Sequence, residues 1–96
     1  MSTPPTAPQV PASARGPALT IDALGKKCPI PIIMLAGRIG EVRVGELVEV
    51  LADDPAAKTD LPAWCMIKSH DFVASTDLAA STALTAGWSF LVRRCY

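Results

Sequence analysis

The chain has no apolar run long enough to span a membrane and no secretion signal. A membrane-spanning helix needs about 20 predominantly apolar residues in a row, and charged or polar residues interrupt every apolar stretch here well before that length. Residues 1–17 lack the basic start and the apolar segment of a signal peptide. We therefore expect a cytoplasmic protein that makes no membrane contact.

Neither sign of charge is in excess. Nine Lys and Arg residues balance nine Asp and Glu residues, so the formal net charge is +0 at pH 7. General nucleic-acid binding relies on a basic surface that displaces counterions from the phosphates. We therefore expect no direct nucleic-acid partner.

Cysteine and histidine residues are too few and too scattered to indicate a metal site. Cys28, Cys65 and Cys95 have no close spacing, and His70 is the single histidine. A metal site needs three or four ligands at compatible spacing, so we expect no metal. Without an export signal, the thiols are expected to stay reduced.

The composition divides the chain into two parts near residue 18. Residues 1–17 hold five of the nine prolines among Ala, Ser and Thr, without apolar periodicity, which is typical of a disordered tail. Residues 18–96 form the one expected domain, of about 80 residues, a size at which a single core gives modest stability.

Hydrophobic patterning predicts strands that alternate with helices in this domain. The expected elements are a strand at 19–24 ended by Gly25, a helix at 30–42, a strand at 47–52, a helix from Asp60 to Ser69, and strands at 72–76 and 88–94. Asp60 is the expected N-cap of the second helix, with Pro62 in its first turn. Asp77 to Gly87 is expected to be a hairpin loop. This order predicts an α/β (α+β) two-layer sandwich, β-α-β-α-β-β, with both helices on one face of the sheet.

The 47–52 strand is expected to turn one side to the helices and the other to solvent. On this alternation Leu47, Glu49 and Leu51 are exposed. The two exposed leucines would allow a weak contact between sheet faces of two copies.

Cys28 lies in the turn between the first strand and the first helix. Lys26 and Lys27 precede it, while Pro29 and Pro31 restrict the backbone after it. A helix N-terminus and nearby cations favour a thiolate over a thiol. We therefore interpret Cys28 as a reactive thiol; the alternative is a small buried hydrophobic residue.

Basic residues near this turn have two interpretations. Lys26, Lys27 and Arg38 form a basic rim around Cys28 that docks an acidic partner, or they are solvated side chains with no partner role. The sequence alone leaves both open.

The histidine and the aspartates also have two interpretations. His70 is either a proton shuttle for a thiol or a residue that stabilises the last carbonyls of the second helix, and we favour the structural role. Asp53, Asp54 and Asp60 are better explained as turn and cap residues than as carboxylates for acid–base chemistry.

These features together resemble the sulfur carrier family called TusA or SirA-like. Its signature is a Cys-Pro-x-Pro run at the start of the first helix, preceded by Leu-Gly and two variable residues, as at residues 24–31. Further agreement covers nearly all of residues 19–94 and includes Gly45-Glu46, Asp53-Asp54-Pro55, Asp60, Pro62, Trp64, Cys65 and His70.

The resemblance implies a four-stranded mixed sheet and a persulfide carried covalently on Cys28, with no other cofactor. The donor would be a cysteine desulfurase or a rhodanese-like sulfurtransferase, and the acceptor a sulfur-relay protein with its own reactive cysteine. The sulfur would serve tRNA thiolation, molybdenum-cofactor biosynthesis or dissimilatory sulfur oxidation. Such a protein is a sulfur-transfer carrier rather than a free-standing catalyst. The motif has Pro31 where a thioredoxin-like motif has a second cysteine, which suits a one-thiol carrier.

A module without covalent chemistry is the alternative function. It would use the same fold as a regulatory or RNA-binding surface, and it would leave a Cys28→Ser variant functional.

Overall fold

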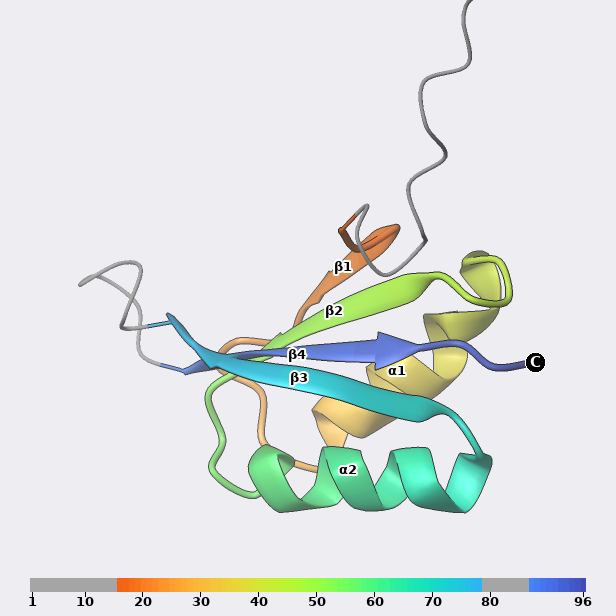
Figure 1. The fold of residues 1–96 in the computed structure, drawn as a ribbon. Coiled ribbons are helices and arrows are strands. Elements are labelled where there is room, and N and C mark those ends of the chain that lie inside the picture. Colours follow the sequence, from red (N-terminus) through yellow and green to blue (C-terminus); the bar gives the residue numbers. More distant parts are fainter. Residues whose placement is uncertain (1–15, 79–86) are drawn as a thin grey trace, which may run out of the picture.

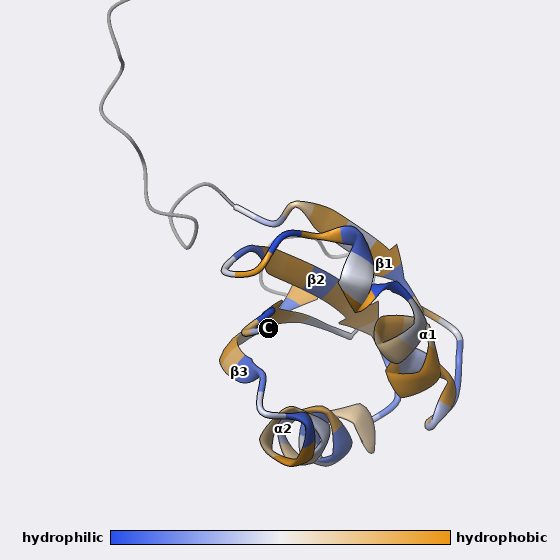
Figure 2. Cartoon of the chain, turned by 90° about the vertical axis from the view of Figure 1, so that its right-hand side faces the viewer, coloured by the Kyte–Doolittle hydropathy of each residue, from blue (hydrophilic) through white to orange (hydrophobic). Residues whose placement is uncertain are grey.

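A four-stranded mixed sheet carries both helices on one face (Figures 1 and 2). The protein is described by a computed structural model over residues 16–78 and 87–96. Within these ranges the elements are β1 (Leu19–Asp22), α1 (Ile30–Arg38), the short 3-10 helix η2 (Ile39–Glu41), β2 (Leu47–Ala52), α2 (Ala57–Lys68), β3 (Asp71–Asp77) and β4 (Trp88–Arg93). Most of the predicted tail at 1–17 and most of the predicted 77–87 loop lie outside the described residues.

The sheet has the strand order β1-β2-β4-β3. β1 pairs with β2 in parallel, whereas β4 is antiparallel to both β2 and β3. The predicted β-α-β-α-β-β order, the mixed sheet and the two-layer architecture are therefore confirmed. α1 connects the two parallel strands, as a crossover helix does.

The core lies between the sheet and the helices. It is built from the inward positions of the strands and one side of each helix, and its fully buried members include Ile21, Leu35, Val48, Val50, Leu61, Phe90 and Val92. The hydropathy colours of Figure 2 show apolar segments on β2 and α1 where the layers meet.

The outer side of β2 is less exposed than the alternation predicted. Leu47 is only 1% exposed, so the prediction that it faces solvent was wrong, and it offers no surface to a second copy. Glu49, the next residue on that side, is half-buried. Its carboxylate accepts hydrogen bonds from the hydroxyls of Thr20 (3.1 Å) and Ser89 (2.5 Å).

α2 begins at Ala57, three residues before the predicted N-cap. The Asp54 side chain accepts a hydrogen bond from the Ala56 N–H at 3.0 Å, and its carbonyl accepts one from the Ala57 N–H at 2.9 Å. These two bonds form a turn that the helix continues. Asp60 therefore lies in the first turn of α2, and the predicted cap was wrong. Pro62 lies inside the helix instead of in its first turn, where its missing N–H removes one helical hydrogen bond.

Candidate functional site

Cys28 occupies a turn that leads directly into α1. The Ile30 N–H donates to the Lys27 carbonyl at 2.8 Å, and α1 begins at Ile30. Pro31 is buried in the first helical turn, as expected, and the Cys28–Pro29 peptide bond is cis. Cys28 itself is half-buried. Its thiol is therefore reachable while its backbone is held.

Two consecutive carboxylates from the loop after β2 hold this turn. The Gly25 N–H lies 3.0 Å from both side-chain oxygens of Asp53, and the Cys28 N–H donates to Oδ2 of Asp54 at 2.8 Å. Because β1 and β2 are parallel neighbours, the loops that follow them leave the same edge of the sheet. Gly25 has φ +79°, a left-handed conformation that costs glycine little. The aspartates thus position the cysteine turn, in addition to the turn role that the sequence predicted.

The charges around Cys28 oppose ionisation of its thiol. Burial raises the pKa of Cys28, and so do the negative charges of Asp54 and Asp60. Hydrogen bonds from the backbone N–H groups of Ala56 and Cys28 lower the pKa of Asp54, so its charge persists at neutral pH. The expectation of a thiol activated by the helix N-terminus was wrong for the free protein.

The predicted basic rim is only partly assembled. Lys26 and Lys27 are exposed in the same turn as Cys28. Arg38 lies at the opposite end of α1, about 13 Å away along a helix of this length, where it pairs with Glu41 at 3.0 Å. Two lysines therefore lie in the same turn as the thiol, and Arg38 is not part of the site.

The remaining cysteines differ from Cys28 and from each other. Cys65 is buried in the core, and this burial, with smaller contributions from Asp71 and Cys95, raises its pKa to about 11. Cys95 is exposed near the end of the chain, and all three cysteines are free. Among the described residues, no group of His, Cys, Asp and Glu is arranged to hold a metal ion.

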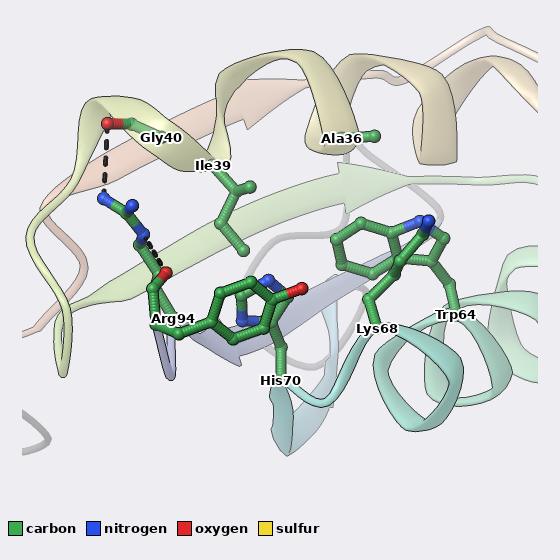
Figure 3. Close-up of a pocket in the computed structure, with 8 residues that line it drawn as sticks. Ala36, Ile39, Gly40, Trp64, Lys68, His70 and Arg94 are labelled. Carbon is green, nitrogen blue, oxygen red and sulfur yellow. Dashed lines mark hydrogen bonds between the residues drawn. The ribbon is translucent and has the colours of Figure 1, made fainter.

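A cavity of about 330 Å³ lies near the C-terminal halves of α1 and α2, away from the cysteine turn (Figure 3). It is lined by Ala36, Ile39, Gly40, Trp64, Lys68, His70, Arg94 and Tyr96. The Arg94 guanidinium donates to the backbone carbonyls of Val42 (2.6 Å) and Tyr96 (2.6 Å). These bonds connect the C-terminal segment to the chain after η2.

His70 has a structural position beside this cavity. Its Nδ1 accepts a hydrogen bond from the Cys95 N–H at 3.0 Å, and its ring stacks on Tyr96 at 4.6 Å and on Trp64 at 5.6 Å between centroids. Burial, and then the charge of Arg94, lowers the pKa of His70. The side chain does not cap α2; the His70 N–H does so by donating to the Cys65 carbonyl at 2.9 Å.

A small α+β sandwich with one accessible thiol in a fixed turn is the arrangement expected of a domain that carries its cargo on a thiol. A family model described as sulfurtransferase TusA matches residues 19–94, and the chain belongs to this family. The structure is also similar to the crystal structure of a SirA-like protein from Desulfitobacterium hafniense, at 25% sequence identity and a TM-score of 0.62, covering 81% of this chain and 99% of that one. A role in carrying sulfur follows from this membership. Over the described residues, no helix is long and apolar enough to cross a membrane.

Proposed function

We propose that this protein accepts sulfane sulfur as a persulfide on Cys28 and relays it from a donor protein to an acceptor protein. The observation that carries the proposal is the position of Cys28, the half-buried thiol of the family's Cys-Pro-x-Pro run, in a turn held by Asp53 and Asp54. The structure also gives Cys28 no disulfide partner. A carrier gains from this arrangement, because a second thiol within reach would attack the persulfide and discharge it.

The transfer step is a thiol–persulfide exchange. The Cys28 thiolate attacks the terminal sulfur of the donor's Cys–S–S–H group, and a new S–S bond forms on Cys28. The bond between the two donor sulfurs breaks, and its electron pair stays on the donor cysteine, which takes up the proton that Cys28 lost. No outside oxidant or reductant is needed. The same exchange passes the sulfur on to the acceptor.

Intact-mass measurement tests this function. The full-length protein is incubated with a cysteine desulfurase and cysteine, or with a rhodanese-like sulfurtransferase and thiosulfate, and the mass is recorded before and after reduction. We expect the wild type and a Cys95→Ser control to gain one reducible sulfur atom, and Cys28→Ser to gain none. Equal loading of Cys28→Ser would refute the assignment.

The cellular acceptor decides which pathway is served. Deleting the gene and measuring tRNA thiolation, molybdenum-cofactor content and sulfur oxidation separates the three pathways that the family resemblance implied. Full complementation by Cys28→Ser would instead favour a module without covalent chemistry.

A further inference from the structure

The cavity of about 330 Å³ takes no part in the sulfur transfer proposed above. It lies where α1 and α2 end, whereas Cys28 precedes the first residue of α1 (Figure 3). Its volume falls within the range of pockets that hold small organic molecules, about 300–1,000 Å³. A small ligand bound in this cavity leaves the thiol accessible.

Aromatic rings form one side of the cavity, and small residues form another. The rings of Trp64 and Tyr96 stack on the ring of His70, with centroids 5.6 Å and 4.6 Å away. Ala36 and Gly40 lie across the cavity from Trp64 (Figure 3). A Cβ atom added at Gly40 would meet no heavy atom within 4 Å, so the backbone there borders open space. A flat apolar group fits between these two sides.

The polar side chains that line the cavity are mainly hydrogen-bond donors. Lys68 is in no ion pair with a described residue, and Arg94 bonds through Nε and Nη1, which leaves Nη2 without a partner among the described residues. Nδ1 of His70 accepts the Cys95 N–H, so the hydrogen of the neutral ring is on Nε2. The described lining contains no Asp or Glu. Two cations and a further donor, without a carboxylate, complement an anion.

The helix ends around the cavity add little negative potential. Unpaired carbonyls at a helix C-terminus carry partial negative charge. At the end of α2, however, the carbonyls of Cys65 and Met66 accept backbone N–H groups, and after η2 the Val42 carbonyl accepts Arg94 at 2.6 Å. The side-chain cations therefore set the sign of the potential in the cavity.

We propose that this cavity binds a small aromatic carboxylate, with its ring between Trp64 and the side formed by Ala36 and Gly40, and its carboxylate paired with Lys68. Arg94 adds to the positive potential around the ligand. The inference goes beyond the proposed function, because no contact of this site involves Cys28. An apolar side chain of a partner protein is the competing occupant, and it would need no negative charge. The charge of the ligand therefore separates the two.

Nuclear magnetic resonance of the isotope-labelled, full-length protein tests the ligand class. The probe is indole-3-acetate, and indole-3-acetamide and tryptamine are its neutral and cationic counterparts. We expect indole-3-acetate to shift the Trp64 indole N–H signal with a Kd of about 1 mM or below, and the two counterparts to bind about tenfold more weakly or less. Trp88, which lies under Lys58, supplies the reference signal. Equal binding of the acetate and the amide, or no Trp64 shift up to about 10 mM, would overturn the proposal.

Lysine variants test where the carboxylate lies. Lys68→Met should raise the Kd of indole-3-acetate about three- to fivefold, and Lys68→Arg should largely retain the wild-type value. Lys58→Met removes the same charge from the first turn of α2 and is the matched control. An unchanged Kd in Lys68→Met, or an equal rise in Lys58→Met, would refute the pairing with Lys68. Cys28→Ser should bind the probe like the wild type, so this test stands whether or not Cys28 proves to carry sulfur.

Discussion

Replacing Leu61 by alanine tests how α2 packs against the sheet. Leu61 is the residue after Asp60 and is 0% exposed. Removing a buried leucine side chain costs about 3 kcal/mol, within a range of about 2–5. A domain of about 80 residues has a total unfolding free energy of about 4–12 kcal/mol. The substitution should therefore remove a large part of the stability, and the melting temperature should fall by about 12–24 °C.

Ile67→Ala on the same helix is the matched control. Ile67 is 75% exposed, so its truncation should change the unfolding free energy by no more than about 0.5 kcal/mol. Urea unfolding followed by tryptophan fluorescence and circular dichroism gives both free energies, and an unchanged m-value shows that the same surface is exposed on unfolding. Equal losses in the two variants would refute the packing of the Leu61 side of α2 against the sheet.

Two further predictions concern groups outside the cysteine turn. His70 has a pKa below that of an unfolded histidine, near 6.5, so the stability it contributes is present above about pH 6.5 and is lost as the pH falls through the folded pKa. Urea unfolding between pH 8 and pH 5 should show this fall, and a His70→Gln variant should show a shallower one; parallel curves would contradict it. Cys65 is buried with a pKa of about 11, so iodoacetamide at pH 7.5 should modify Cys28 and Cys95 in the native protein and reach Cys65 only after denaturation. Mass mapping of the alkylated peptides would reveal early labelling of Cys65, which would exclude the packed core position.

Local sequence patterns predicted most of the fold. The alternation in β2 and the helical spacing in α1 depend on residues close in sequence. β2 has the predicted bounds, and α1 begins at the predicted residue but ends at Arg38, where the short 3-10 helix η2 takes over before the predicted end at residue 42. The start of α2 was missed because a turn around Asp54 begins the helix before the residue with the better capping propensity, Asp60. Side-chain bonds from a preceding loop compete with local propensity, and propensity alone is a weak guide to helix ends.

Pairs of residues far apart in the sequence decided the electrostatics of the site. Asp53 reaches Gly25 across 28 positions and Asp54 reaches Cys28 across 26. One signal could have indicated these contacts, since loops that follow neighbouring parallel strands leave the same edge of the sheet. The sequence pattern did not show which strands would be neighbours.

The sequence by itself determined that a single cysteine with two following prolines would lie at the start of the first helix of a small α+β domain. Proline geometry and short-range periodicity are local, so they can be predicted from adjacent residues. Only the tertiary structure decided that Cys28 meets acidic side chains as well as the two adjacent lysines. The charge that acts on a thiol depends on distance through space and on exclusion of water, and both are set when the β2 loop and α2 pack around the turn.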